Sequence, residues 1–321
     1  MSIFVSVASY RDPLLCGTLQ SLFEQADEPA KLYVGVVDQG RPEERLEIDA
    51  SLRERVRYVH VDARDTLGLG WARTLASSFY NFEEWYLQID SHMQFSPGWD
   101  TRMRVLAQQC SSLNPKLVIS SHPPAFTLSP TGEPELAPTS DLVAAHVVKE
   151  GEQLSVDSSL LRYQSILVQS AGPIRGAHLA GGCLFARGDF FHEVPYDPFL
   201  YFSEEEQALA VRGYTHGWDV FHVQGLPIFH LYNTEKGGVA RSLHWRDIQD
   251  PQRTFTWQML NARSQQRLNR LLGGHPGMGV YGLGSARTLA EYAAFSGVDY
   301  VNKVIEPCAY YGHWRCRASA G

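Results

Sequence analysis

The chain has 321 residues, of which 44% are hydrophobic and 12% aromatic, and its formal net charge is −7. This composition excludes a disordered chain, because it supplies enough apolar surface for one large core or two modest ones. The negative charge and the absence of a basic run speak against nucleic-acid binding, which needs an electropositive face. No apolar run approaches the roughly 20 residues of a membrane helix, so we expect no membrane span.

The start of the chain and its cysteines indicate the compartment. The first seven residues carry neither a basic leader nor a small-residue cleavage site, so we expect them to form the first strand and not a secretory signal. The five cysteines are scattered and never spaced Cys-x-x-Cys, which argues against a disulfide framework and a thiolate zinc site. We therefore expect buried or idle thiols in a cytoplasmic protein.

Short β-branched runs alternate with helical patterns through the first 120 residues. The strands are expected at 3–9, 32–37, 56–61, 85–89 and 117–120, and the helices at 16–25, 71–79 and 99–109. This rhythm predicts an α/β fold with a mixed central sheet flanked by helices. Such a sheet binds ligands at the carboxyl ends of its strands, where the connecting loops begin.

The pattern weakens between 123 and 171, where five prolines occur. We therefore expect an irregular excursion over 123–177 that carries acceptor contacts or a lid. Regular patterns return with an apolar segment at 184–186, a helix at 204–212, a strand at 218–223 and helices at 252–272 and 286–295. We expect one α/β domain over 1–235 and a helical and loop extension over 236–321 that packs on it.

Polar residues stand at the ends of three predicted strands. These residues are of the kind that hold nucleosides, phosphates and cations: Ser9, Tyr10 and Arg11 after the first strand, Asp38 after the second, and Asp90, Ser91 and His92 after the fourth. The carboxyl ends of parallel strands share one edge of the sheet, so these side chains are expected to form one site.

Asp90 and His92 are spaced by one residue and so project toward the same side of the strand end. A carboxylate and an imidazole suit a divalent ion such as Mn²⁺, or Mg²⁺, that acts as a Lewis acid on a departing diphosphate. His230, at the end of an apolar run, is the best candidate for the third ligand, and His216, His222 and His244 compete with it. The alternative is that Asp90 caps a turn and His92 is an ordinary histidine.

Three glutamates, 204 to 206, begin a predicted helix, where carboxylates also favour the positive N-terminal end. We choose Glu205, with Glu206 beside it, as carboxylates aimed at a sugar or acceptor hydroxyl, and with Asp90 they are the predicted catalytic residues. Arg73 is expected to reach phosphate or to order Asp90; the alternative is a plain surface arginine. The glycines at 68 and 70 do not form a dinucleotide loop, because the third glycine is absent.

A set of motifs occupies the segments 7–13, 71–73, 87–100, 193–198, 205–206, 215–219 and 287–299. Together they resemble the cytoplasmic polypeptide N-acetylglucosaminyltransferases that modify hydroxyproline in protists. The Asp-Ser-His motif at 90–92 is also similar to that of the mucin-type polypeptide N-acetylgalactosaminyltransferases. The likeness covers most of 1–233, although the segment 123–171 contributes little to it.

This resemblance implies a GT-A fold with a catalytic domain over 1–235, Mn²⁺, and retaining transfer from UDP-GlcNAc to a hydroxyl of hydroxyproline, Ser or Thr. It places Ser9, Tyr10 and Arg11 against the uridine, and the donor set is completed by Asp38, Arg73, Asp90 and Ser91. It assigns Asp90, His92 and His230 as the metal ligands and places Glu205 at the acceptor or donor sugar. The alternatives are a glycan acceptor in polysaccharide synthesis and a non-catalytic UDP-sugar-binding protein. The oligomeric state is not indicated.

Overall fold

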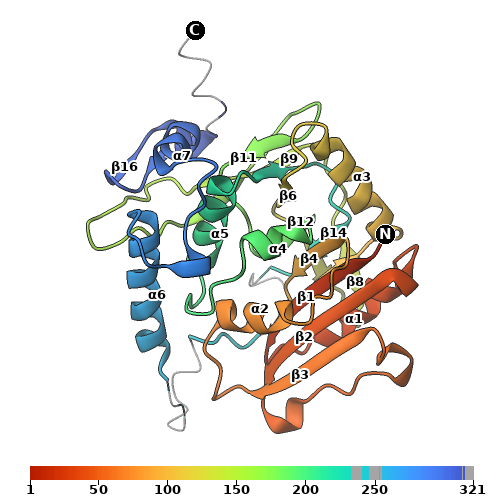
Figure 1. Ribbon diagram of the computed structural model, residues 1–321. Coiled ribbons are helices and arrows are strands. Elements are labelled where there is room, and N and C mark those ends of the chain that lie inside the picture. Colours follow the sequence, from red (N-terminus) through yellow and green to blue (C-terminus); the bar gives the residue numbers. More distant parts are fainter. Residues whose placement is uncertain (233–240, 246–252, 254, 313, 315–321) are drawn as a thin grey trace.

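A mixed β-sheet forms the centre of the computed structural model, which describes residues 1–232, 241–245, 253, 255–312 and 314 (Figure 1). In this part of the chain the sheet has eight strands in the order β11-β13-β6-β12-β4-β1-β2-β3. Their bounds are β1 Ile3–Tyr10, β2 Leu32–Gly40, β3 Val56–Asp62, β4 Trp85–Ile89, β6 Leu117–Ile119, β11 Ile174–Gly176, β12 Cys183–Arg187 and β13 Asp219–His222. Strands β3, β2, β1 and β4 are parallel, whereas β12 is antiparallel to β4 and β6.

Helices cover both faces of this sheet (Figure 1). Helices α1 (Leu15–Glu24) and α3 (Trp99–Ser111) pack on the face that receives Ile3, Val5 and Val7 of β1. Helices α2 (Leu69–Ser77), α4 (Asp189–Glu193) and α5 (Glu204–Thr215) pack on the opposite face. Both faces of β1 are therefore buried, which explains its nearly continuous apolar sequence.

The segment 123–177 is more regular than the sequence predicted. It contains β7 (Phe126–Leu128) and β8 (Pro134–Leu136), which pair with each other, and β9 (Val143–Val148) and β10 (Tyr163–Val168), which form a second antiparallel ribbon. Strand β11 joins the central sheet. The prolines made the segment look irregular, but none lies within β9 or β10, so the ladder of that ribbon is uninterrupted.

The later part of the chain adds α6 (Trp257–Leu272), α7 (Leu289–Ser296), α8 (Cys308–Tyr311), and a small ribbon of β15 (Val298–Asp299) and β16 (Val304–Ile305). An apolar cluster joins it to α5, with Ala208 and Val211 on one side and Leu268, Leu272 and Tyr292 on the other. The predicted domain boundary at 235 and helix start at 252 lie outside the described residues. Short 3-10 turns occupy Pro29–Lys31, Pro42–Glu44, Ala50–Leu52 and Gly279–Tyr281.

The cysteines follow the sequence expectation with one exception. Cys16, Cys110 and Cys183 are free thiols, and the last two are buried. Cys308 is disulfide-bonded, so the expectation of an idle thiol is wrong there. Across the described residues, no helix has the length and apolarity that crossing a membrane requires.

Candidate active site

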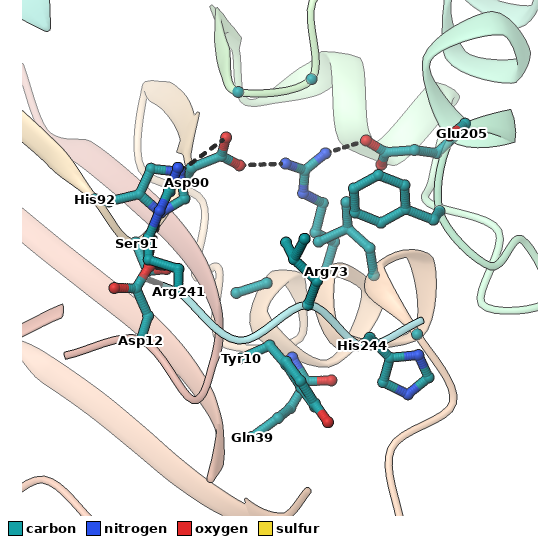
Figure 2. Close-up of a pocket in the computed structure, with 18 of the residues that line it drawn as sticks. Tyr10, Asp12, Gln39, Arg73, Asp90, Ser91, His92, Glu205, Arg241 and His244 are labelled. Carbon is teal, nitrogen blue, oxygen red and sulfur yellow. Dashed lines mark hydrogen bonds and ion pairs between the residues drawn. The ribbon is translucent and has the colours of Figure 1, made fainter. Parts of the chain in front are cut away.

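A cavity of about 470 Å³ lies at the carboxyl ends of β1, β2 and β4 (Figure 2). Its remaining walls are the start of α2, the glycines before β12, the start of α5, the end of β14 (Ile228–His230) and the segment 241–245. This is the edge of the sheet where the sequence placed the site, and the parallel pairing of β1 with β2 and β4 brings the three strand ends together.

Asp90, His92 and His230 converge at one end of this cavity (Figure 2 labels the first two). The Nε2 atoms of the two histidines are 3.0 Å apart, and Nε2 of His230 is 3.2 Å from Oδ2 of Asp90. Nε2 of His92 is 3.9 Å from the same carboxylate oxygen. One ligand atom from each of the three residues lies within 4.8 Å of the others, and none of the three side chains is fully exposed.

A small β-ribbon brings the distant histidine to this place. Strand β5 (Met93–Phe95) pairs with β14 (Ile228–His230), and His230 stands opposite Met93. The amide of Leu231 donates to the carbonyl of His92 at 3.1 Å. The backbone ladder therefore sets the two imidazoles side by side, although 137 residues separate them along the chain.

The three ligand atoms suit a divalent ion. Donors in adjacent positions around an ion with bonds of about 2.1 Å stand about 3 Å apart, which is close to the shorter distances here. Oδ2 of Asp12 lies 2.7 Å from Nδ1 of His92 and accepts a hydrogen bond of the same length from Ser91 Oγ. When Nδ1 carries the proton, Nε2 of His92 presents its lone pair to the site, the arrangement found behind metal-binding histidines.

The other histidines that the sequence left open lie elsewhere. His222 is fully buried, with Nδ1 2.5 Å from the carbonyl of Ser120 and Nε2 accepting from the amide of His146. His216 contacts the carbonyl of Arg212. His244 lines the cavity, but its ring nitrogens contact Tyr201 and Arg253. In the described chain, His230 is the histidine that joins Asp90 and His92.

Arg73 connects the metal-site carboxylate to the glutamates. Its Nη2 donates to Oδ1 of Asp90 at 3.0 Å, and its Nη1 donates to Oε1 of Glu205 (Figure 2). Arg73 and Glu205 are almost completely buried. Of the two roles expected for Arg73, the structure shows the ordering of Asp90, and a surface arginine is excluded.

The carboxylates have unequal proton affinities. Burial acts to raise the pKa of Asp90, but the hydrogen bond with His230 and the charges of His92 and Arg73 outweigh it and hold this pKa far below its usual value. Burial raises the pKa of Glu205 in spite of Arg73. Burial and the neighbouring Glu205 raise the pKa of Glu206 to about 7, although the amide of Gly181 opposes this shift.

The three consecutive glutamates separate into two groups. Glu205 and Glu206 line the cavity, and Oε1 of Glu206 accepts a hydrogen bond of 2.6 Å from the amide of Gly181. Glu204 is fully buried away from the cavity, with Oε2 accepting from the amide of Phe202 at the start of α5. Helical spacing explains the separation, because successive residues point about 100° apart around the axis.

Gly181 and Gly182 form a close wall beside these side chains. A Cβ atom at Gly181 would stand 2.5 Å from Oε1 of Glu205 and 2.8 Å from Nη1 of Arg73. A Cβ atom at Gly182 would stand 2.8 Å from Oδ2 of Asp90. These positions therefore accept only glycine without displacing the charged groups. Gly68 and Gly70 instead approach the backbone of Tyr201 and Leu200, with Gly68 at φ 106°.

Side chains alternate between the two faces along each strand, and this alternation decides which strand-end residues face the cavity. Ala8 and Tyr10 of β1 line it together with Gln39 of β2, which pairs with Tyr10. Ser9 and Asp38 pair with each other one position earlier and do not line it.

The neighbouring residues follow the same division. Tyr58 donates to Asp38 at 2.6 Å, so this carboxylate is engaged away from the cavity. Arg11, at φ 46°, forms an ion pair with Glu44 and does not line the cavity either. Ser91 does line it.

Several residues of the site were not predicted from the sequence. Asp12 and Gln39 directly follow the predicted residues Arg11 and Asp38 in the chain, but the sequence assigned them no role. The paired glycines at 181 and 182 were a readable signal, because adjacent glycines before a strand indicate close backbone approach. Arg241, whose Nη2 donates to the carbonyl of Leu231 at 2.8 Å, lines the cavity without any local pattern that marks it.

The mixed sheet with helices on both faces is a GT-A fold, and the cluster of Asp90, His92 and His230 lies at its carboxyl edge. The family model described as "Glycosyltransferase (GlcNAc)" matches residues 2–51 and 41–302. The chain belongs to this family.

One solved structure supports the fold. GalNAc-T7 with UDP, GalNAc and Mn²⁺ is 17% identical with a TM-score of 0.52, over 74% of this chain and 45% of that one. The chain thus spans less than half the length of that protein. TarS 1–349 from S. aureus in complex with UDP-GlcNAc is 15% identical with a TM-score of 0.44, over 86% and 74% of the two chains. No curated protein matches this sequence.

Proposed function

We propose that this protein is a metal-dependent, retaining glycosyltransferase that moves N-acetylglucosamine from UDP-GlcNAc to a hydroxyl of a polypeptide. The observation that carries the proposal is the convergence of Asp90, His92 and His230 beside the Arg73–Glu205 pair at the carboxyl edge of the sheet. The family match supports the sugar, and the resemblance to hydroxyproline-modifying enzymes supports the acceptor. GalNAc-T7, which shares the fold, was solved with UDP, GalNAc and Mn²⁺.

The donor occupies the cavity from β1 and β2 toward the histidines in this proposal. Tyr10 and Gln39 line the cavity at the ends of β1 and β2, and they suit a uracil ring, since aromatic rings stack on one another. Asp90, His92 and His230 would hold Mn²⁺ or Mg²⁺, which when bound acts as a Lewis acid toward the leaving diphosphate. A single carboxylate and two neutral imidazoles leave that centre positive, as a charged leaving group requires.

Retention without a covalent intermediate agrees with the state of the carboxylates. Within the described cavity wall, each of these carboxylates already has a hydrogen-bond partner. Asp12 is hydrogen-bonded to His92, Glu205 to Arg73, and Glu206 to the amide of Gly181. We infer that the acceptor oxygen attacks C1 from the face that UDP leaves. The C1–O bond to UDP breaks, and the acceptor proton passes to the departing phosphate oxygen. Glu206 orients a sugar hydroxyl in this proposal. A carboxyl group with a pKa of about 7 can donate a hydrogen bond when protonated and accept one when ionised.

UDP release tests the proposal directly. The full chain is incubated with UDP-GlcNAc, Mn²⁺ and a hydroxyproline-, Ser- or Thr-containing peptide, with and without a chelator, and the product anomer is assigned by NMR. We expect α-linked product, loss of turnover with chelator, and loss in Asp90→Asn. The exposed His275→Asn is the matched control and retains activity. Chelator-resistant turnover contradicts the metal role, and UDP-GlcNAc binding without UDP formation indicates a binding protein.

We also propose a cytoplasmic location, on the resemblance to cytoplasmic enzymes. The disulfide at Cys308 is the observation that speaks against it, because disulfides are rare in reducing compartments. Cell fractionation tests the location, and thiol labelling tests the redox state of Cys308. Recovery in the soluble cytoplasmic fraction with Cys308 reduced supports the location, and recovery in an oxidising compartment contradicts it.

A further inference from the structure

A second cavity, of about 310 Å³, adjoins the active site at Tyr232. Tyr232 lines both cavities, and its ring centroid is 4.3 Å from that of His230. Its hydroxyl donates to the carbonyl of Pro123 at 2.7 Å, which holds the ring in place between the two spaces. The second cavity therefore begins one aromatic ring away from a proposed metal ligand.

The walls of this cavity are apolar and uncharged. They come from the segment after β6, the ribbon of β9 and β10, and the loop after β13, and include Pro123, Pro124, Leu142, Leu167 and Leu226. Among the described residues that line it, none is Asp, Glu, Lys or Arg. A charged group bound here would lose water without gaining a counter-charge, which is unfavourable.

His122 supplies one polar position in this wall. Its ring stacks on Tyr232 with a centroid distance of 5.7 Å, and on His146 at 5.2 Å. Its Nδ1 is buried and has no hydrogen-bond partner among the described residues. Burial lowers the pKa of His122, so the imidazole is neutral and offers one donor or acceptor at physiological pH.

The mouth of the cavity opens to solvent at Leu167. This side chain on β10 is 65% exposed, although it is apolar, and it lines the cavity beside Ser165 of the same strand. A chain that enters the cavity from solvent would therefore contact Leu167 first.

We propose that this second cavity is the acceptor subsite, and that it selects polypeptides in which the residue next to the modified hydroxyl is apolar and uncharged. The inference rests on the proposed polypeptide transfer and adds the flanking-residue specificity. Because Tyr232 lines both cavities, a residue bound in the second cavity lies one aromatic ring away from His230, while the uncharged wall disfavours acidic peptides and phosphate-bearing glycans.

Peptide binding tests this inference without relying on turnover. Two fluorescein-labelled peptides with a central hydroxyproline, one flanked by Leu and Pro and one by Asp, are titrated into the full chain with UDP and Mn²⁺. We expect the apolar peptide to bind at least ten-fold more tightly. Leu167→Glu weakens its binding about ten-fold, whereas Leu167→Arg improves binding of the Asp peptide. Val156→Glu, at a side chain that is 87% exposed outside the cavity, is the matched control and changes neither.

Slow hydrolysis of UDP-GlcNAc, measured without acceptor, reports donor binding and cleavage separately from acceptor binding. Unchanged hydrolysis in the Leu167 variants locates their effect at the acceptor. Equal affinity for the two peptides, no binding of the apolar peptide, or an unaffected Leu167→Glu variant overturns the subsite. Peptide discrimination without any hydrolysis retains the subsite and contradicts the proposed transfer instead.

Discussion

Oδ2 of Asp12 and Nδ1 of His92 lie 2.7 Å apart, and this contact directs the opposite nitrogen of the imidazole toward Asp90 and His230. Asp12 is not itself a member of the proposed ligand group. Burial opposes the ionisation of Asp12, but the hydrogen bond and charge of His92 lower its pKa on balance, so it is a carboxylate at neutral pH. We propose that its role is to fix the orientation and tautomer of His92, which is a proposed metal ligand.

Asp12→Asn should therefore weaken Mn²⁺ binding without removing a ligand. We expect the dissociation constant to rise about 10- to 100-fold, the usual effect of losing the partner behind a metal-binding histidine. Titration followed by the EPR signal of free Mn²⁺ measures it. Asp141→Asn, at an exposed carboxylate, serves as the control. Equal affinity in Asp12→Asn and the native chain would show that Asp12 does not act through His92.

Arg73→Met should destabilise the fold, because it leaves Glu205 buried without its counter-charge. Breaking a buried ion pair from one side costs about 3–5 kcal/mol. Adding Glu205→Met should recover much of this loss while leaving the enzyme inactive. Urea unfolding of the native chain, both single variants and the double variant gives the coupling. Additive effects of the two changes would contradict the pairing.

Glu206 should make stability depend on pH between about 4.5 and 7. Its folded-state pKa of about 7 exceeds the reference value of 4.5, so the folded state holds the proton more tightly. This contribution is fully present below pH 4.5 and is lost as the pH rises to 7. Glu206→Gln should therefore gain stability relative to the native chain over this range, on the order of 2 kcal/mol at pH 7.

Unfolding curves at several pH values check the Glu206 prediction. The exposed Glu135→Gln is the matched control for the loss of a carboxyl group. A constant difference for Glu206→Gln would mean that its carboxyl ionises normally in the fold.

Gly182→Ala should impair metal binding through steric contact. The added methyl group would stand 2.8 Å from Oδ2 of Asp90, so the carboxylate has to move. We expect at least ten-fold weaker Mn²⁺ binding by calorimetry. Gly172→Ala is the matched control, since a Cβ atom there meets nothing within 4 Å. If both variants bind Mn²⁺ equally well, the wall at Gly182 does not define the site.

Much of the fold could be predicted from the sequence because its signals are local. The strands β1 to β4 and the helices α1 and α3 are close to the predicted ranges, since β-branched runs and helical spacing act over neighbouring residues. The segment 123–177 was mistaken for an irregular one. Its strands are short, and β9 and β10 are stabilised by pairing with each other and by burial against distant residues.

The site divides in the same way. Asp90 and His92 were recognisable because both come from one strand end, and two residues of one chain segment keep their spacing in any fold. The face of the strand to which each side chain points was harder to assign. Tyr10 and Gln39 face the cavity, whereas Ser9 and Asp38 do not. Strand pairing and burial decide which of the two alternating sets faces the cavity.

The sequence by itself determined the α/β class, the polar residues at the strand ends, and two members of the metal-type cluster, Asp90 and His92. Only the tertiary structure decided that His230 joins them, that Arg73 spans Asp90 and Glu205, and that Asp12 orients His92. These contacts link residues 17 to 140 positions apart. Such distances depend on strand order and on the packing of the apolar faces, which no local pattern encodes.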